Sequence, residues 1–433
     1  MNRYEEYKKV NLIWLKEIPS HWEIMPISHV FEERRERNNN GNNQFILSVM
    51  KNIGVIPYTD KGNVGNKASE NIENYKVVYP NDLVLNSMNM MIGSLGKSNY
   101  KGVLSQVYYV LKLMNSSKYS IDYLNYLFKN KVFHESFRVL GKGILDHRLR
   151  VPIQLLKYEK ILIPPINEQE QIANYLDWKI NEIDRLIQIE KKKIKELNQI
   201  MQFIIDSGYK VLNIQDTIST GTKIKYLAKQ ITKRTSESRR YIALENVISK
   251  KGVLNVSYDE LDFNNDGISV EKDMVIFGKL RPYLAKTIVV ENRAVCSSEF
   301  LVLKPDNLFP LYLKYLMLSS KFIDLVDSST YGTKMPRANS DFILNLRIVV
   351  PGLSEQKENV EKILKNEGKI NKSIELILRK MKSMEDLKQS LISEVVTGKI
   401  DVRNVVIPEY EKVTVLDDEV EEFDEKEGIE DGN

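Results

Sequence analysis

The chain has 433 residues, of which 42% are hydrophobic and 28% charged, and a net charge of +4, a composition typical of a folded protein with two or three domains. No apolar run approaches the roughly 18 residues that would span a bilayer, and the opening MNRYEEYKKV lacks the apolar core of a secretory signal. The single cysteine, Cys296, excludes an internal disulfide and indicates a reducing, cytoplasmic location, and the four histidines form no metal-ligand spacing with it. We therefore expect no membrane segment and no structural metal.

The charge is unevenly distributed. Asp417 to Asn433 contains ten acids and one lysine, a local charge of −9, so the total of +4 leaves +13 on residues 1–416. A tail of this composition is predicted to be disordered because it has little apolar surface to bury. The basic body fits a polyanionic partner, and it equally fits a solvated lysine-rich surface, so the charge alone does not decide.

Taken in chain order, the sequence predicts five segments. Short strand-like runs, Gly/Asn turns and a few helices fill residues 1–166, and one long helix follows over 167–208. A second mixed domain is predicted over 209–353, a second long helix over 354–398, and a C-terminal segment with the acidic tail over 399–433. Both long helices carry apolar residues at alternating steps of four and three, the 3.5-residue repeat of coiled-coil packing. These seam residues include Leu176, Ile183, Ile187, Ile194, Leu197, Ile370, Ile374, Ile377, Met381 and Met384. Charged Glu190, Glu367 and Lys388 interrupt the seam.

The two halves are copies of one unit. The dipeptide Glu-Gln opens both long helices, with Glu168 and Glu355 lying 187 residues apart. Further matches pair Asp82–Leu85 with Asp273–Ile276, Tyr108–Lys112 with Phe300–Lys304, and Tyr123–Phe128 with Tyr312–Met317. Duplication is the economical explanation. The expected fold class is α+β, with two globular mixed domains in a pseudo-twofold arrangement, separated by two long antiparallel coiled-coil helices.

The Glu-Gln dipeptide is interpreted as a helix start. Proline stops the preceding strand, and Asn167 or Ser354 is placed to cap the helix. Glu168 and Glu355 then lie in the first turn, where the helix dipole favours negative charge by about 0.3–1 kcal/mol. Neither glutamate is predicted to be catalytic.

Catalytic motifs are missing from the sequence, whereas groups suited to nucleic acid are present. It contains no Walker P-loop, no dinucleotide-binding glycine turn and no Asn-Pro-Pro-aromatic signature of amino-methyltransferases. Lys and Arg neutralise phosphates, and Arg and Asn are the favoured readers of guanine and adenine in the major groove. The candidate DNA-binding residues of the first copy are Arg34, Arg35, Asn86, Asn89, Lys97, Ser98, Tyr100, Lys101, Lys142 and Arg148. Those of the second copy are Lys233, Arg234, Lys279, Arg281, Tyr283, Lys286, Thr333, Lys334 and Arg337.

The sequence resembles the specificity subunit of Type I restriction–modification systems over residues 1–405. The segments that carry the resemblance are IPSHWE (Ile18–Glu23), GVLSQVYYVL (Gly102–Leu111), KDMVIFGKLRPYLAK (Lys272–Lys286), CSSEFLVLKP (Cys296–Pro305), YGTKMPRANSDFILNLRIVVPGLSEQ (Tyr331–Gln356) and TGKIDVR (Thr397–Arg403). Gly141-Lys-Gly-Ile-Leu-Asp-His does not match Gly332-Thr-Lys-Met-Pro-Arg, which indicates that the halves read different bases.

The resemblance implies a non-catalytic subunit in which each domain, as a target-recognition domain, reads one half of a bipartite, gapped site in double-stranded DNA. It implies that the long helices set the gap and dock two modification (methyltransferase) subunits through the seam residues named above. It also places S-adenosylmethionine in the modification subunits, and ATP and Mg in separate restriction/translocase subunits, so no cofactor is expected on this chain. Two alternatives are a scaffold that binds partners other than DNA and a fused enzyme that itself cleaves or methylates.

Overall fold

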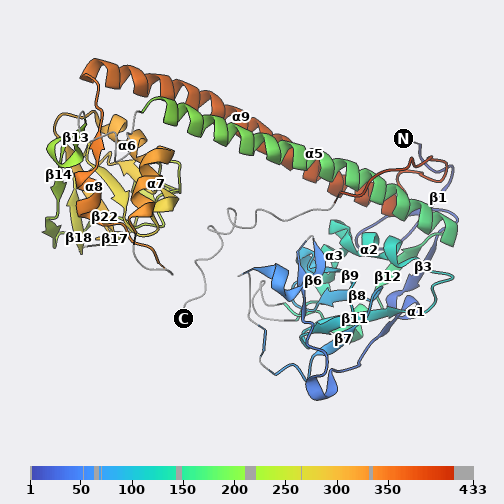
Figure 1. Cartoon of the computed structure of the whole chain (residues 1–433). Coiled ribbons are helices and arrows are strands. Elements are labelled where there is room, and N and C mark those ends of the chain that lie inside the picture. Colours follow the sequence, from blue (N-terminus) through green and yellow to red (C-terminus); the bar gives the residue numbers. More distant parts are fainter. Residues whose placement is uncertain are drawn as a thin grey trace. The chain divides into compact units, whose positions relative to one another are not determined.

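The computed structural model describes residues 2–51, 53–62, 68–69, 71–142, 149–209, 221–264, 266–330 and 335–413 (Figure 1). It divides into two compact units, residues 1–189 with 380–433 and residues 190–379. The long helices are α5 (Ile166–Ser207) and α9 (Leu353–Val396), predicted over 167–208 and 354–398. Because the units divide both helices, the domain boundaries drawn from the sequence stay predictions.

The first unit is built on a four-stranded antiparallel sheet in the order β4-β11-β8-β9. These strands are β4 (Phe31–Glu33), β11 (Tyr108–Leu113), β8 (Leu83–Asn86) and β9 (Leu95–Lys97). All of β8 is buried, because Leu83 and Leu85 enter the main core and Val84 enters a second cluster on the opposite face. A strand covered on both faces reads as a continuous apolar run.

Helices cover one side of this sheet, and small strand pairs complete the unit. The helix α2 (Ile121–Lys129) packs against β9 and buries the aromatic and aliphatic side chains whose spacing predicted it. The remaining elements are β1 (Tyr7–Lys9), β2 (Glu17–Pro19), β3 (Glu23–Pro26), α1 (Ile27–Val30), η1 (Asn39–Gly41), β5 (Leu47–Met50), β6 (Gly54–Pro57), η2 (Tyr58–Lys61), β7 (Lys76–Val78), η3 (Met90–Ile92), β10 (Gly102–Leu104), α3 (Lys131–Ser136), η4 (Phe137–Leu140), α4 (Ile153–Leu156) and β12 (Lys160–Ile163).

The second unit repeats the central sheet strand for strand, in the order β14-β22-β19-β20. These strands are β14 (Ala228–Ile231), β22 (Phe300–Pro305), β19 (Val275–Gly278) and β20 (Thr287–Val289). Helix α6 (Pro310–Leu318) packs on β19 and β20, as α2 packs on β9. The same strand order in both units is what duplication predicts.

The copies differ at the side of this sheet. The first unit has the hairpin of β5 with β6 and the pair of β7 with β10, whereas the second has a five-stranded sheet, β15-β18-β21-β16-β17. Its remaining elements are β13 (Thr222–Lys223), η7 (Ile224–Tyr226), β15 (Arg234–Thr235), β16 (Arg239–Ile242), η8 (Tyr258–Glu260), β17 (Phe263–Asn264), β18 (Gly267–Val270), η9 (Pro282–Leu284), β21 (Ala294–Cys296), α7 (Ser320–Ser328), α8 (Ser340–Asn345) and β23 (Arg347–Ile348).

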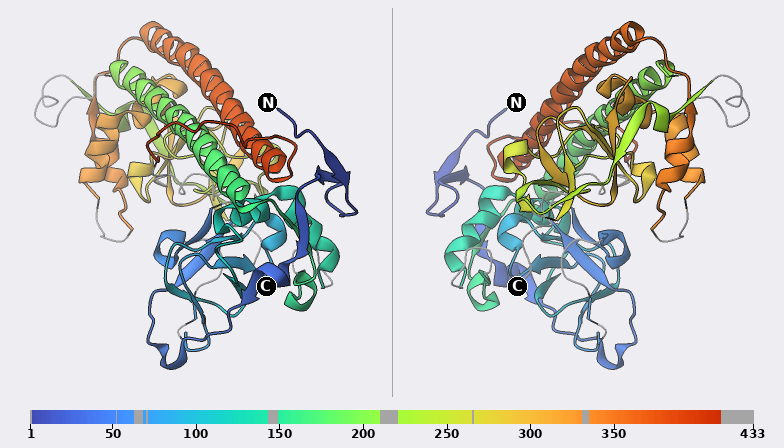
Figure 2. Two further views of the ribbon diagram at one scale, coloured as in Figure 1. Left: turned by 90° about the vertical axis from the view of Figure 1, so that its right-hand side faces the viewer. Right: turned by 90° about the vertical axis from the view of Figure 1, so that its left-hand side faces the viewer.

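The two long helices pack against each other within each unit, side by side in Figures 1 and 2. In the first unit the start of α5, at Leu176, shares a core with the end of α9, at Val395. In the second unit the end of α5, at Ile205, shares a core with the start of α9, at Ile363. The helices are therefore antiparallel in both units, as predicted. In the described part of the chain, no helix has the length and apolar character needed to cross a membrane.

The charged residues that interrupt the seam have polar partners. Lys388 Nζ lies 2.7 Å from Asp184 Oδ1, and the Tyr315 hydroxyl donates to Glu367 at 2.7 Å. Glu190, buried at 4% exposure, accepts from Lys193 at 3.0 Å. Pairing of this kind offsets part of the cost of placing charge in an apolar seam.

The predicted helix caps were wrong. Helix α5 begins at Ile166 and α9 at Leu353, so Asn167 and Ser354 lie inside the first turn. The Gln169 N–H donates to the Pro165 carbonyl at 3.0 Å, so the hydrogen-bonded turn starts before Asn167. Pro165 directly precedes α5 and Gly352 directly precedes α9, so neither predicted cap residue occupies the position before its helix.

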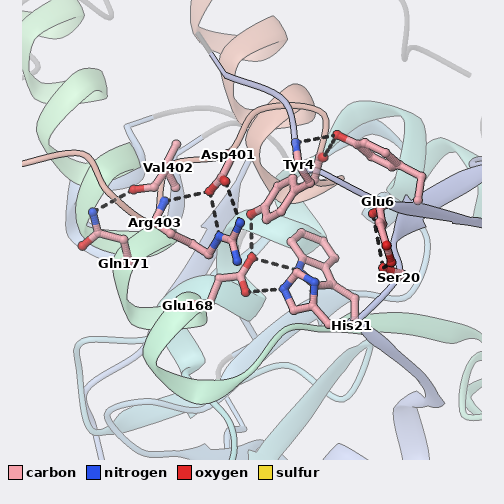
Figure 3. A network of polar contacts seen from close by, with 12 residues as sticks. Tyr4, Glu6, Ser20, His21, Glu168, Gln171, Asp401, Val402 and Arg403 are labelled. Carbon is pink, nitrogen blue, oxygen red and sulfur yellow. Dashed lines mark hydrogen bonds and ion pairs between the residues drawn. The ribbon is translucent and has the colours of Figure 1, made fainter.

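The buried Glu168 carboxylate joins the N-terminal segment to the first turn of α5 (Figure 3). It accepts hydrogen bonds from the Tyr4 hydroxyl at 2.5 Å and from the Trp22 indole at 2.9 Å, and it lies 2.8 Å from His21 Nε2. Burial and this hydrogen bond to Glu168 raise the pKa of Tyr4. Since Glu355 is exposed, the dipole interpretation suits Glu355 but was incomplete for Glu168, which is a buried anchor.

Candidate nucleic-acid interface

Three loops meet at one end of the central sheet in the second unit. The loop after β19 lies between the turn that precedes β22 and the segment 335–338. The Lys279 N–H donates to the Glu299 carbonyl at 2.9 Å, and the Ala338 N–H donates to the Lys279 carbonyl at 2.9 Å. We call this arrangement the second three-loop junction.

The first unit contains the same backbone connections. The Ser87 N–H donates to the Val107 carbonyl at 3.2 Å, and the Val151 N–H donates to the Ser87 carbonyl at 2.9 Å. Ser87, Val107 and Val151 therefore hold the places of Lys279, Glu299 and Ala338. We call this the first three-loop junction. The backbone frame is shared, whereas the side chains on it differ.

The loop after β19 holds an unusual backbone conformation. Arg281 and Ala285, which flank η9, have φ angles of +51° and +47°, in the left-handed region. At the place of Ala285 the first copy has Gly93, with φ +92°. Non-glycine residues in this region cost of order 1 kcal/mol or more and cluster at functional sites. The left-handed turn after the 3-10 helix is thus kept in the second copy without a glycine, whereas Arg281 has no left-handed counterpart, because Asn89 at its place has a φ of −114°.

Charged side chains fill the second junction. Arg337 Nε donates to Glu299 Oε2 at 3.1 Å, and Arg337 Nη2 donates to Glu299 Oε1. Lys279 is half-buried beside this pair, and burial lowers the pKa of its ammonium group while Glu299 opposes the shift. Glu299 is therefore the carboxylate around which two predicted DNA-binding residues, Lys279 and Arg337, meet.

The first junction is neutral at the places of Lys279 and Glu299 and amide-rich around them. Asn86 is buried, and its Oδ1 accepts the N–H groups of Met88 at 3.0 Å and Asn89 at 3.3 Å, so it shapes the loop. Asn89 is exposed. Lys142 and Arg150, both exposed, form an isolated backbone bridge beside it. Asn89 and Lys142 are thus the predicted residues placed to meet a ligand here.

Other predicted residues of the first copy cluster around the start of β8, away from the junction at its end. Arg34 makes a two-bond ion pair with Asp82, at 2.8 and 3.0 Å, and lies over the Tyr79 ring at 4.5 Å. The Asp82 side chain is only 3% exposed. A base contact by Arg34 would break this buried pair, so the geometry favours a structural role for Arg34.

The neighbours of Arg34 are placed in different ways. Lys97 pairs with Asp122 at the start of α2, and Ser98 is fully buried in a turn with Tyr100. Lys101 lies over the Tyr79 ring at 5.1 Å, and exposed Arg35 pairs with Glu33. The predicted residues of the first copy are therefore divided between two places, the start of β8 and the junction at its end.

The second copy gathers more of them. Lys233 and Arg234 are exposed just past the end of β14, which lies at the same end of the sheet as the junction. Arg281 and Tyr283 are exposed on the loop after β19, and Lys286 Nζ donates to the Leu244 carbonyl at 3.0 Å. Arg148, Thr333 and Lys334 lie outside the described residues.

One exposed contact between an arginine and an aromatic ring was not predicted from the sequence. The Arg240 guanidinium lies 4.3 Å from the centroid of the Phe263 ring, and Phe263 is 63% exposed. An exposed aromatic ring beside arginine is a surface suited to nucleic acid. The basic pair at 239–240 was visible in the sequence, but its pairing with β17 was not.

The predicted docking residues of the long helices lie mostly between the helices. Leu176, Ile183, Ile187 and Ile370 are buried, whereas Ile194, Leu197, Ile374, Ile377, Met381 and Met384 are partly covered. Other apolar residues of these helices are exposed: Leu186, Ile189, Ile200, Phe203, Leu364, Leu376, Leu378 and Leu387. The seam holds the helices together, so the exposed set is the better candidate for contact with a partner.

Comparison with known proteins shows the family of the chain. A family model described as the Type I restriction modification DNA specificity domain matches the chain twice, over residues 19–199 and 207–380. These two matches cover most of the chain and follow the internal repeat.

Similar proteins cover nearly the whole chain. It is 24% identical to the Type I restriction enzyme MjaVIII specificity subunit of Methanocaldococcus jannaschii, over 90% of this chain and 95% of that protein. It is 22% identical to the putative type I restriction enzyme MjaX specificity subunit of the same organism, over 92% and 97%. A chain solved in work on complex assembly and conformational transition of the type I R-M system has a TM-score of 0.62 at 12% identity, covering 88% of this chain and 99% of that one. This structural likeness confirms the predicted fold class of two mixed domains linked by long helices.

Proposed function

From the premise that the chain belongs to the Type I restriction–modification DNA specificity family, we propose that its two three-loop junctions read the two halves of a bipartite, gapped DNA sequence. Recognition of DNA sequence is the function of the family. The observation that carries the proposal is the shared backbone frame of the junctions, on which Lys279 and Glu299 replace Ser87 and Val107. A constant frame with different side chains suits two readers of different bases.

The two junctions together offer two kinds of contact. Exposed Lys233 and Arg234 are suited to phosphate oxygens, which fix the orientation of a protein on the duplex. Asn89 and Arg337 are suited to base edges, because Asn pairs with adenine and Arg with guanine through two hydrogen bonds. Affinity that depends on several Lys and Arg contacts to phosphate falls steeply with salt.

We further propose that this chain is the non-catalytic specificity subunit of a complex. Two modification subunits with S-adenosylmethionine would supply methyl transfer, and restriction subunits with ATP and Mg would supply cleavage. The exposed apolar residues of α5 and α9 support a docking role for the helices, because side chains such as Phe203 and Leu376 gain by leaving water.

The test is methylome sequencing of a host that expresses the chain with its modification subunits. We expect a single bipartite motif with an unread gap of constant length. Replacing Lys279 and Arg281 together with alanine should relax one half of the motif, whereas Lys225→Ala, an exposed lysine before β14, should change nothing. Methylation or binding without sequence preference would contradict the proposal and favour a scaffold.

A further inference from the structure

We infer that Arg337 reads a guanine in the half-site of the second domain, and that Glu299 is the positioning residue that orients it. The inference rests on the proposed function and adds to it one base, one reading residue and the group that aims it.

The first argument is the geometry of the pair. Arg337 Nε and Nη2 donate to the two oxygens of Glu299, so the carboxylate holds one edge of the planar guanidinium. Two bonds fix the orientation of a guanidinium as well as its position. A side chain that only neutralises a phosphate does not need such orientation, whereas a base reader does.

The second argument is how rigidly both residues are held. Arg337 forms a backbone bridge with Leu280, and the Glu299 carbonyl accepts the Lys279 N–H at 2.9 Å. Arg337 and Glu299 thus lie on two of the loops that the junction ties together. A reader that is already in place before DNA arrives loses less conformational entropy on binding.

The third argument is exposure. The Arg337 side chain is 44% exposed, whereas that of Glu299 is 25% exposed and both of its oxygens accept from Arg337. Lys279 is half-buried, and burial lowers the pKa of its ammonium group. Among the three charged groups of the junction, Arg337 is therefore the one turned most toward solvent.

The fourth argument is the comparison with the first junction. By the shared backbone connections, Arg150 holds the place of Arg337, and Val107 holds the place of Glu299. A valine side chain cannot accept a hydrogen bond, so Arg150 has no carboxylate at this place to orient it. The two junctions thus offer a matched pair of arginines, one oriented by a carboxylate on the neighbouring loop and one not.

The chemistry then selects the base. Guanine presents its O6 and N7 acceptors side by side in the major groove, and the guanidinium is the group that most often pairs with both. Adenine presents a donor at N6 beside N7 and would face an arginine N–H with another donor. We therefore expect a required G·C pair in the half-site of the second domain.

The experiment compares four versions of the full chain and one control variant, each expressed with its modification subunits and analysed by methylome sequencing. These are wild type, Arg337→Ala, Glu299→Val and the double variant, with Arg150→Ala as the matched control. Arg337→Ala should lower the preference for guanine at one position of one half-site about 10- to 100-fold. Glu299→Val should lower it at the same position by a smaller factor. The double variant should match Arg337→Ala alone, because Glu299 acts through Arg337.

The controls separate reading from folding. Arg337→Ala should leave the other half of the motif unchanged, and Arg150→Ala should leave the guanine position unchanged. The inference is overturned if wild type shows a bipartite motif and Arg337→Ala keeps the guanine preference, or if all positions of the half-site weaken equally. A wild-type complex without any bipartite motif would instead overturn the proposed function itself.

Discussion

Gln169 and Gln356 occupy the same position in the two copies and make the same pair of hydrogen bonds. Gln169 accepts the Ser120 N–H and donates to the Pro164 carbonyl, both at 2.8 Å. Gln356 accepts the Phe309 N–H at 2.8 Å and donates to the Pro351 carbonyl at 2.9 Å. Ser120 and Phe309 directly precede the equivalent helices α2 and α6. The shared element of the Glu-Gln dipeptide is thus the glutamine, which joins that helix to the long one.

Replacing Gln356 with leucine should destabilise the second unit by about 1–3 kcal/mol, because it leaves the Phe309 N–H and the Pro351 carbonyl without their partner. Chemical denaturation followed by circular dichroism measures this. Gln356→Glu keeps the side-chain oxygen that accepts the Phe309 N–H, so it should destabilise the second unit less than the leucine variant. The adjacent exposed residue Lys357 gives the control, and Lys357→Ala should change stability by less than about 0.5 kcal/mol. A leucine variant as stable as wild type would show that the glutamine is dispensable.

Gly398→Ala should destabilise the first unit strongly. Gly398 follows α9 with φ +72°, and an added Cβ would lie 2.4 Å from Pro19 Cδ and 3.2 Å from the Trp22 ring. Left-handed strain and overpacking each cost about 1–3 kcal/mol. Thermal unfolding measures the loss, and Trp22 fluorescence should report the displaced ring.

The matched control for Gly398 is Gly368, inside α9, where an added Cβ meets nothing within 4 Å. Gly368→Ala should stabilise the chain by about 0.5–1 kcal/mol, since alanine is the better helix former. If both variants changed stability in the same direction, the steric account of Gly398 would be wrong.

Periodicity explains what the sequence could predict. The apolar seam through Leu176 and Ile183 is a local pattern, because its residues are only a few positions apart in the sequence. The alternating residues of the strands that start near Asp82 and Asp273 are local patterns of the same kind. The matched strands and the two long helices followed from these patterns, whereas the antiparallel pairing was predicted from the duplication, since the seam alone would equally allow parallel pairing.

The site could not be predicted in the same way, because it depends on partners far apart in the chain. Glu168 pairs with Trp22 across 146 positions, and Arg34 is bound by Asp82 across 48. Glu299 and Arg337 come from different loops, and no local pattern places the carboxylate against the guanidinium. Both Arg34 and Arg337 were predicted to bind DNA because both are arginines in polar loops. Only the structure shows that Arg34 is held in a buried ion pair, whereas the ion pair of Arg337 is exposed.

His134 should make the first unit less stable in mild acid. The ring is buried, its Nδ1 lies 3.0 Å from the Met91 carbonyl, and burial lowers its pKa below the ordinary 6.5. The unfolded chain then binds a proton more readily than the folded chain. The free energy of unfolding is therefore highest at a pH above the pKa that His134 has in the unfolded chain. It decreases as the pH falls through this value toward the lower pKa that His134 has in the folded chain.

The measurement is denaturant unfolding of wild type and His134→Gln at about pH 7.5 and about pH 5.5, which bracket the ordinary histidine pKa. Glutamine can still donate to the Met91 carbonyl but does not titrate. The loss of stability between the two conditions should be smaller in the variant. An equal loss in both proteins would assign the acid sensitivity to other groups.

Phe203 and Ile205 offer the sharpest test of the helices as a docking surface, because they are two positions apart on α5 with opposite surroundings. Phe203 is 73% exposed, whereas Ile205 is 4% exposed in the core of the second unit. Phe203→Ser should change stability by less than about 0.5 kcal/mol but weaken co-elution with the modification subunits in size-exclusion chromatography. Ile205→Ser should instead destabilise the chain by about 2–4 kcal/mol, since it removes buried apolar volume.

If the Phe203→Ser variant bound the modification subunits as tightly as wild type, this face of α5 would not be part of the interface. The exposed residues of α9, beginning with Leu376, would then be the next to replace.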